Sequence, residues 1–425
     1  MKAQRTLPPS AAPIDWSDLL LSLGGLLHSQ AAIRRRETEF RDYFGVKHVW
    51  FVSSGKAALT LILQALHSLS GKQKVIVPGY TCFSVPSAVL RAQLDVTLCD
   101  VDPYSFDLDI DQLGRLADAN VLCVLATHLL GAGVDVARIV ELCRPRGIVV
   151  IEDAAQAFGG HVEGKPIGTL GDVSFLSFGR GKNLSCGSGG AVLSNDDRIA
   201  AAISREYAQL PEESVFGMLK NWFEVAATQL LIDPSVYWLP AGLPFLKLGE
   251  TKFFRDFSIF KMDPVRAGLL RRWKRRLARA TTSRITHAEK VMQLLSASHI
   301  QTIPTAGQGR SVFLRLPLLM RSKQQKEALC RLSDEQGLGI SSMYPSSVRD
   351  IAELRTTFSS QPVPQAAMLA ERLVTLPTHE FLSPHDLKRI CRAIEQVHQP
   401  DGLRPACLPK AHEDQHARSE LHGIN

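Results

Sequence analysis

The chain has 425 residues, of which 45% are hydrophobic and 21% are charged, a balance typical of a folded globular protein. This length exceeds what one small core needs and predicts a large domain followed by a smaller one. The formal net charge of +7 is concentrated around RRWKRR at 271–276. No nucleic-acid-binding motif with interleaved aromatic residues accompanies that run, so we do not expect nucleic acid as a partner.

The eight cysteines are scattered along the chain, and none forms a Cys-x-x-Cys pair or a Cys/His cluster with the spacing of a metal site. This distribution predicts free thiols in a reducing cytoplasm and no bound metal. Asp15 and Asp18 interrupt the first apolar run, so we expect no secretory signal peptide. No apolar run reaches the length that spans a membrane, and we therefore expect a cytoplasmic protein.

The distribution of apolar runs, glycines and prolines predicts five segments. They are a helical N-terminal arm over 1–45, a large domain over 46–260, a connecting basic helix over 261–294, a small α+β domain over 295–400 and a disordered tail over 401–425.

In the large domain, short apolar runs rich in β-branched residues alternate with helical stretches. Strands are predicted at 49–53, 74–78, 95–101, 121–127, 148–153 and 173–178. Helices are predicted at 55–69, where apolar residues recur at helical spacing, and at 136–147, which ends in a glycine. Strands that are apolar on both faces and separated by helices predict an α/β fold with a mostly parallel sheet covered on both sides.

The large domain also contains an insertion over 205–260 that departs from this pattern. It begins with the apolar helical run VFGMLKNWFEVAATQLL and continues with SVYWLPAGLPFLKLG, which is aromatic and contains proline. One interpretation is a buried helical insertion or a contact between two subunits. The other is an interfacial segment that rests on a membrane, which would make the protein membrane-peripheral.

Beyond the insertion, the sequence predicts the elements of the connecting helix and the small domain. A basic helix is expected over 264–293, and a strand over 311–319. A helix over 323–337 is closed by glycine, and an amphipathic helix over 383–397 begins at the capping residue Ser383.

Polar residues stand at the ends of predicted strands in the large domain. Ser54, Gly55 and Lys56 lie between a strand and a helix, where glycine and the free N–H groups of a helix start suit a phosphate group. Asp153 ends another strand, at the edge where open α/β sheets bind ligands, and a carboxylate there can hold a cationic ring nitrogen. The alternative is that Asp153 caps the following helix.

Three further residues extend this group. Gln156 can reach a second polar atom of the same ligand, and the hydroxyl of Ser177 can donate to a phosphate oxygen. Lys182 follows in the glycine-rich loop SFGRGKNLSCGSGG at 177–190. A phosphate site, a carboxylate and a lysine in one region match the needs of pyridoxal phosphate (PLP), whose aldehyde forms a Schiff base with lysine.

Several stretches, taken in order, resemble the DegT/DnrJ/StrS family of nucleotide-sugar aminotransferases. SSGKAAL resembles the family's SGTAAL, KVIVPGYTCFSVPSAVL its VIVPSYTFVATANAVL, and CDVDPYSFDLD its VDIDPDTFNID. IEDAAQAFGGHVEGKPIGTLGDVSFLSF is close to EDAAQAHGAEYKGKKVGSLGDIGCFSF, and VTLPTH resembles the late SLPTHP. The resemblance implies PLP-dependent transferase fold type I, with a mostly parallel seven-stranded sheet flanked by helices and a smaller C-terminal α+β domain.

The resemblance also implies roles and partners. Lys182 would be the catalytic lysine that binds the cofactor and moves protons, Asp153 would pair with the pyridine nitrogen, and Gln156 would contact the ring's 3-hydroxyl. Family members are usually homodimers that transfer an amino group from L-glutamate to a nucleotide-linked keto sugar in polysaccharide or glycoconjugate biosynthesis. The cofactor phosphate would be held by Ser177, Ser54, Gly55, Lys56 and Ala57.

The sequence departs from the family pattern at several positions. Lys56 stands where Thr is usual, and Cys82 stands where an aromatic ring stacks on the cofactor, so that Phe83 or Tyr80 would take over. The NYR-type motif is missing near FSIFKM, and Arg349 stands where His is typical. These departures leave open a second function, a PLP-fold protein without transaminase turnover that acts as a regulatory or membrane-peripheral assembly component of polysaccharide synthesis.

Overall fold

The computed structural model describes residues 4–26, 29–243, 251–297 and 309–398. At its centre seven strands form one sheet, in the spatial order β1 His48–Val52, β9 Gly190–Ser194, β8 Val173–Ser177, β5 Val149–Asp153, β4 Val121–Thr127, β2 Lys74–Pro78 and β3 Asp95–Cys99. β9 is antiparallel to both of its neighbours, and the pairs from β8 to β3 are parallel. The prediction of an α/β fold with a mostly parallel seven-stranded sheet is confirmed.

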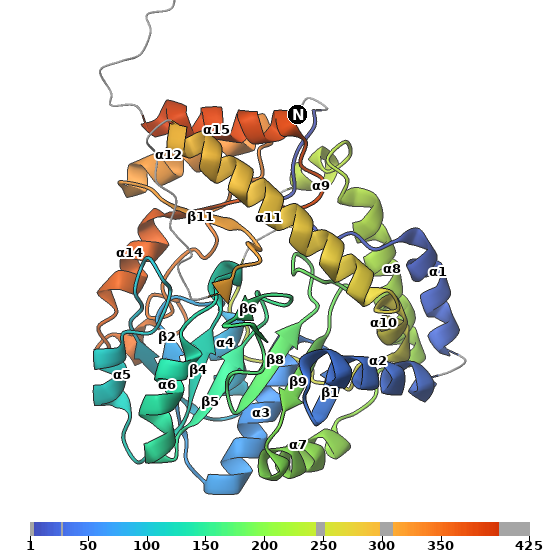
Figure 1. Cartoon of the computed structure of the whole chain (residues 1–425), viewed down its shortest axis with the longest axis vertical. Helices are drawn as coiled ribbons and strands as arrows, with labels where there is room; N and C mark the ends of the chain where they lie inside the picture. The colour runs from blue at the N-terminus through green and yellow to red at the C-terminus, as the bar shows by residue number, and fades with distance from the viewer. Residues whose placement is uncertain (1–3, 27–28, 244–250, 298–308, 399–425) are drawn as a thin grey trace, which may run out of the picture.

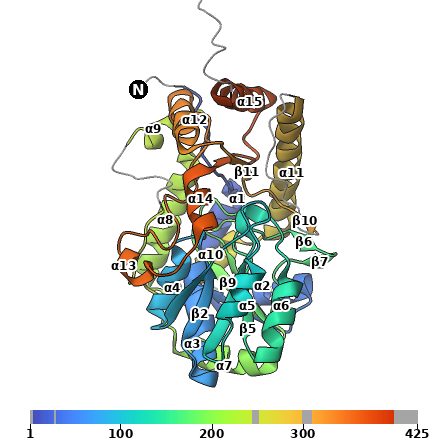
Figure 2. The same cartoon turned by 90° about the vertical axis from the view of Figure 1, so that its left-hand side faces the viewer.

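Helices cover both faces of this sheet. Figure 2 shows α3 Gly55–Ser70 and α4 Ser84–Arg91 on one face, and α2 Ser29–Phe44 and α6 Val136–Cys143 on the other. The alternation of side chains along β1 produces these layers. Trp50 and Val52 join the same apolar cluster as α3, whereas Phe51 packs against Phe40 of α2.

The six strands predicted for the large domain coincide with β1, β2, β3, β4, β5 and β8. Helix α3 begins after Ser54 and ends at Gly71, whose φ of 68° is the left-handed conformation that closes a helix. β9 was not predicted, because its first residue, Gly190, belongs to the glycine-rich loop, and glycine runs are typical of turns. The remaining elements of this part are α5 Ile110–Leu116, β6 His161–Val162, β7 Lys165–Pro166, α7 Asp197–Gln209 and the short 3-10 turns Leu129–Gly131 and Arg144–Arg146.

The helix expected over 264–293 is two helices, α10 Pro264–Leu269 and α11 Trp273–Ala297. The guanidinium of Arg36 donates to the carbonyl oxygens of Leu270 and Arg271, each at 2.9 Å. These bonds satisfy carbonyl groups that a continuous helix would have used, and they stabilise the break between α10 and α11.

The small domain stands above the carboxyl edge of the sheet, and α11 runs from the large domain into it (Figure 1). It contains β10 Gly309–Arg310, β11 Leu316–Leu319, α12 Lys323–Gln336, α13 Arg355–Phe358, α14 Pro364–Arg372, β12 Leu373–Leu376 and α15 Pro384–His398. β11 pairs with β12 in antiparallel register and covers only the second half of the strand expected over 311–319. α15 begins after Ser383, as predicted, and the hydroxyl of Ser383 accepts from the N–H of Asp386 at 3.2 Å.

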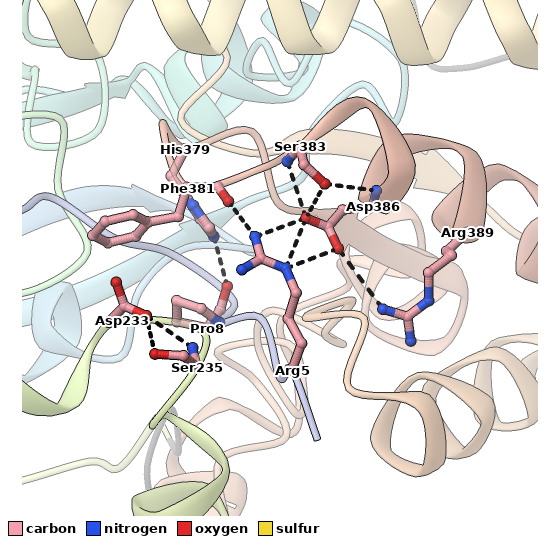
Figure 3. Close-up of polar contacts among 9 residues, drawn as sticks. All are labelled: Arg5, Pro8, Asp233, Ser235, His379, Phe381, Ser383, Asp386 and Arg389. Carbon is pink, nitrogen blue, oxygen red and sulfur yellow. Dashed lines mark hydrogen bonds and ion pairs between the residues drawn. The ribbon is translucent and has the colours of Figure 1, made fainter. Parts of the chain in front are cut away.

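Residues 4–14, called here the N-terminal strap, join the small domain to the large one. Figure 3 shows Arg5 of the strap against the buried Asp386 of α15, at 2.9 Å, and His379 donating to the carbonyl of Pro8 at 2.8 Å. Burial lowers the pKa of His379 to about 3, so this imidazole is neutral. Further along the strap, the hydroxyl of Ser10 donates to the carbonyl of Gly181 at 2.8 Å, next to Lys182.

The insertion contains α8 Val215–Leu231 and α9 Trp238–Ala241, and α8 has the bounds of the predicted apolar run. Its side chains are largely exposed in the single chain: Phe216 is 79% and Phe223 64% exposed. The interpretation of the insertion as buried is therefore wrong for the single chain. Trp222 of α8 donates to the carbonyl of Leu19 at 2.9 Å, which holds α8 beside α1 Trp16–Ser22 (Figure 1).

Much of the basic run at the start of α11 serves internal contacts. Arg276 and Arg284 are buried and donate to backbone carbonyls. Arg272 pairs with the buried Asp18 at 2.8 Å, and Arg279 pairs with Glu380 at 2.8 Å. These arginines therefore hold α11 against neighbouring segments of the same chain.

No helix within the described ranges is both long enough and apolar enough to cross a membrane. The tail predicted over 401–425, and residues 298–308 of the predicted small domain, lie outside the described residues.

Candidate active site

The carboxyl ends of β4, β5 and β8 meet at one edge of the sheet, where parallel sheets bind ligands. Asp153, the last residue of β5, lies beside Thr127 of β4 and Phe175 of β8. It is 6% exposed, and its carboxylate accepts from the N–H of Ala155 at 3.0 Å. Burial raises the pKa of Asp153, and the charge of Lys182 opposes that rise without cancelling it. The structure thus brings Asp153 and Lys182 together at this edge.

The neighbouring Glu152 has a different environment. Its carboxylate accepts from His128 at 2.9 Å, from the N–H of Gly168 at 2.6 Å and from the N–H of Leu170 at 2.8 Å. Burial alone would raise the pKa of Glu152, but the hydrogen bond from His128 and these backbone donors outweigh that effect and hold the pKa below its usual value. Glu152 is therefore a structural carboxylate, whereas Asp153 is available to a ligand.

His128 belongs to the same structural contact. Its Nδ1 accepts from the N–H of Val134 at 3.1 Å, so its proton lies on Nε2, which donates to Glu152. The imidazole is fully buried, with both nitrogens in use. This arrangement positions the strand ends and leaves His128 no group to offer a substrate.

The loop that carries Lys182 is held from three directions. Ser10 of the strap bonds the carbonyl of Gly181, whose φ of 78° suits glycine. The amide of Asn183 donates to the carbonyl of Phe158 at 2.8 Å and to Thr281 of α11 at 2.9 Å. Lys182 itself is partly exposed. The backbone on both sides of the lysine is therefore fixed while its side chain remains accessible.

The start of α3 and the end of β8 approach each other closely. The hydroxyl of Ser54 accepts from the N–H of Ala57 at 3.1 Å and caps the helix. A Cβ at Gly55 would come within 2.8 Å of the Cβ of Ser177, so glycine is required for this approach. The N–H groups of Gly55 and Lys56 lie in the first turn, where a helix has no carbonyl for them.

The side chain of Lys56 packs on aromatic rings. Its ammonium group lies 4.2 Å from the ring centroid of Phe257 and 5.7 Å from that of Phe254. Such contacts are attractive because the face of an aromatic ring carries negative charge. Burial lowers the pKa of Lys56. The backbone of Lys56 lies in the first turn of α3, whereas its ammonium group contacts the last part of the insertion.

Gln156 and the aromatic residues form the side of the site that faces the small domain. Gln156 accepts from the N–H of Leu130 at 3.0 Å and donates to the hydroxyl of Tyr344 at 2.8 Å. Tyr80 and Phe83 are buried and pack around Tyr344, with ring centroids at 5.3 Å and 6.3 Å. Tyr344 was not predicted as a site residue, although it begins the stretch YPSSVR, which ends at Arg349.

These residues fit a cofactor with a phosphate, an aldehyde and a cationic ring. Free N–H groups of α3, the hydroxyl of Ser177 and the close approach at Gly55 suit a phosphate. A buried carboxylate suits a ring cation, and a lysine within its electrostatic reach suits an aldehyde. Among the described residues, no group of three or more His, Cys, Asp or Glu side chains is arranged to hold a metal ion.

Comparison with known proteins agrees with this geometry. The model of the DegT/DnrJ/EryC1/StrS aminotransferase family matches residues 21–395. The GDP-perosamine synthase of Vibrio cholerae is 33% identical over 195 residues, which cover 46% of this chain and 52% of that protein. The match therefore spans about half the length of that relative.

Two longer matches extend over most of the chain. The dTDP-3-amino-3,4,6-trideoxy-alpha-D-glucose transaminase of Micromonospora megalomicea is 26% identical over 392 residues, 90% of this chain and 94% of that protein. The Escherichia coli GDP-4-keto-6-deoxy-D-mannose-3-dehydratase, solved with bound hydrated PLP, superposes with a TM-score of 0.73 at 17% identity, covering 92% of this chain and 100% of that one. At that identity the superposition shows a shared fold. Because the family model spans most of the sequence, the chain belongs to the DegT/DnrJ/EryC1/StrS aminotransferase family.

Proposed function

We propose that this protein is a PLP-dependent aminotransferase that moves an amino group from an amino acid, L-glutamate, to a nucleotide-linked keto sugar. The observation that carries the proposal is the placement of Lys182 within electrostatic reach of the buried Asp153, at the sheet edge that also contains the start of α3. When bound there, PLP supplies an aldehyde and a ring that withdraws electrons from the reacting carbon.

Each residue at the sheet edge has a definite task in this proposal. The amine of Lys182 attaches the cofactor and then moves a proton at the reacting carbon. The carboxylate of Asp153 keeps the ring nitrogen protonated, and Gln156 orients the ring through its 3-hydroxyl. The phosphate is bound at the start of α3, by Ser54, Gly55, Lys56 and Ala57, together with Ser177. Phe83, which packs on Tyr344, would contact the cofactor ring.

The substrate class is supported by the relatives. The Vibrio cholerae and Micromonospora megalomicea proteins are named for GDP-linked and dTDP-linked amino sugars. We infer that this chain likewise acts on a sugar nucleotide, in the synthesis of a polysaccharide or glycoconjugate and in the cytoplasm.

An absorbance experiment tests the proposal. The native protein mixed with PLP should show the visible band of a lysine-bound cofactor, and L-glutamate should convert it to the pyridoxamine form. Lys182→Ala should lack the band and lose amino transfer by about 10⁴-fold or more, because attachment and proton transfer both need that amine. The exposed Lys165→Ala is the matched control and should behave as the native protein. If no amino donor alters the band of the native protein, the result would instead support the alternative of a PLP-fold protein without transaminase turnover. If the native protein shows no band, PLP binding is refuted.

We further propose that the protein forms a homodimer through the apolar face of α1 and α8. Phe216, Phe223 and Leu230 recur every seven residues along α8 and are exposed, as is Leu20 on α1. Among the charged residues of α8 are Lys220 and Glu224, whose charges cancel, and this favours a second copy over an anionic membrane surface.

Light scattering combined with size-exclusion chromatography tests the assembly. The native chain should have the mass of a dimer, and Phe216→Glu with Phe223→Glu should have the mass of a monomer with an unchanged circular dichroism spectrum. If the native protein floats with anionic vesicles and the double variant does not, this proposal is overturned. That result would support the membrane-peripheral interpretation of 205–260.

A further inference from the structure

A cavity of about 620 Å³ lies next to the loop of Lys182. Its wall is assembled from segments that are far apart in the sequence: the strap, the lysine loop, the insertion and the small domain. We call its residues Pro8, Ser10, Thr228, Tyr237 and Arg315 the cavity wall, and Gly181 connects this wall to the lysine. The insertion, which the sheet-edge chemistry does not use, thus contributes Thr228 and Tyr237 to the active-site region.

Arg315 is the residue of this wall with unused binding capacity. Its Nη1 donates to the hydroxyl of Ser341 at 2.6 Å and to that of Thr375 at 3.4 Å. These partners are neutral, and no carboxylate forms an ion pair with Arg315 within the described ranges. Its Nη2 and Nε make no hydrogen bond to another described residue, so both remain available to an acceptor in the cavity.

The groups around Arg315 do not neutralise its positive charge, and one of them is a second arginine. Burial lowers the pKa of Arg315, and Tyr344 and Tyr237 oppose that shift. Burial lowers the pKa of Arg284, and the charge of Arg315 lowers it further. Arg284 therefore lies close to Arg315. An anion placed at Arg315 would therefore be attracted by the half-buried Arg315 and by the buried Arg284, in a site of reduced dielectric constant.

The two other arginines nearby differ from Arg315. Arg284 is 1% exposed, and it donates to the carbonyls of Leu314 and Ala11 at 2.7 and 2.8 Å, so it is a structural residue. Arg180 lines the same cavity but pairs with Glu224 at 3.3 Å, and its side chain is 57% exposed. Of the three, Arg315 alone is half-buried, lines the cavity and lacks an acceptor of opposite charge among the described residues.

We propose that Arg315 binds the α-carboxylate of the amino-acid donor, which deepens the proposed aminotransferase function and rests on it. In an amino acid the carboxylate and the reacting amine are attached to the same carbon, so a carboxylate site must lie close to the lysine. Arg315 meets this condition, because it lines the same cavity as Gly181, the residue that precedes Lys182. The diphosphate of a sugar nucleotide is separated from the aminated carbon by atoms of the sugar ring and belongs further out.

The test uses the PLP-loaded protein and Arg315→Gln, with Arg205→Gln, an exposed arginine of α7 outside the cavity, as the control. Loss of a charge-assisted, two-pronged contact should weaken apparent L-glutamate affinity in the spectral half-reaction by about 10- to 100-fold. The response to 4-aminobutanoate, which is L-glutamate without its α-carboxylate, should not change. Binding of succinate, measured by calorimetry without turnover, should weaken in parallel, and Arg205→Gln should leave each value as in the native protein.

Arg315→Lys controls for a folding artefact, because lysine keeps the positive charge but cannot form the two parallel hydrogen bonds of a guanidinium. It should fall between the native protein and Arg315→Gln in L-glutamate affinity, with all three variants unfolding cooperatively on heating. Unchanged affinities for L-glutamate and succinate in Arg315→Gln would overturn the assignment. Weaker binding of GDP with unchanged L-glutamate affinity would also overturn it and assign the anion to the diphosphate.

The two proposals fail in different ways. If the native protein gives no spectral response to L-glutamate but binds succinate through Arg315, the aminotransferase function fails and the carboxylate site stands. If the native protein responds to L-glutamate and Arg315→Gln responds equally, the function stands and the carboxylate site fails.

Discussion

The sheet edge and the cavity wall are built in different ways. At the sheet edge, each polar residue follows its own strand or begins its own helix, so short stretches of sequence position Asp153, Ser177 and Gly55. In the cavity wall, Ser10, Tyr237 and Arg315 come from segments that meet only in the folded chain. The first arrangement suits chemistry common to many proteins, and the second suits the choice of a particular substrate.

The two regions also differ in how they compensate charge. At the sheet edge, the buried Glu152 is surrounded by donors, and the buried Asp153 lies in the field of Lys182. In the cavity wall, Arg315 has hydroxyl partners. Asp153 therefore suits a cation, and Arg315, which has no carboxylate partner among the described residues, suits an anion.

Of the substitutions that distinguish the two regions, Asp153→Asn, which removes the charge at the sheet edge, has the largest expected effect. Amino transfer should fall by about 10³-fold, because the amide cannot stabilise a protonated ring nitrogen. The pKa of Asp153 is higher in the folded state than in the unfolded state. Ionisation of Asp153 therefore destabilises the fold as the pH rises through these two pKa values. The cofactor-free variant should therefore be more stable to urea than the native protein at neutral pH. A less stable variant would contradict this account of Asp153.

A smaller effect, on stability, is expected for Glu152→Gln. The variant should lose about 2–4 kcal/mol of unfolding free energy, because the buried donors around residue 152 lose their charged acceptor. Since the pKa of Glu152 is lowered in the folded state, its stabilisation is present at neutral pH and is lost as the pH falls through the folded pKa. Urea unfolding should show the difference from the native protein shrinking on acidification.

Asp197→Asn is the control for Glu152→Gln, because Asp197 is an exposed carboxylate that also pairs with a histidine, His48. This variant should show no measurable change in unfolding free energy. Equal losses of unfolding free energy in Glu152→Gln and Asp197→Asn would show that the burial of Glu152 at the sheet edge does not cause the loss.

The smallest effect is expected for Arg5→Gln in the strap. Arg5 is 42% exposed, and Asp386 keeps its bonds from Ser383, so the variant should lose about 0.5–1 kcal/mol of unfolding free energy. Arg35→Gln, which removes a pair on the surface of α2, is the control and should change stability less. A loss above that of Glu152→Gln would show that the strap, rather than the sheet edge, dominates stability.

The same comparison explains what the sequence could predict. The strands, the capped start of α3 at Ser54 and the residues at the sheet edge were predictable because their signals lie within a few neighbouring residues. The bounds of α8 were predictable from helical periodicity, but its exposure was not, since periodicity does not specify what a face packs against. The break between α10 and α11 depends on Arg36, which lies more than 200 residues away, and the contact of Arg315 with Ser341 is also tertiary. Tyr344 was predictable in principle, because it lies in the same short stretch as Arg349, where the sequence departs from the family pattern.

The central claim is that Lys182 is the residue that attaches the cofactor. The most direct measurement is borohydride reduction of the PLP-loaded protein, followed by proteolysis and mass spectrometry of the labelled peptide. The account predicts the reduced cofactor on Lys182, with no label in Lys182→Ala. A label on Lys56, or on any other lysine of the native protein, would contradict it.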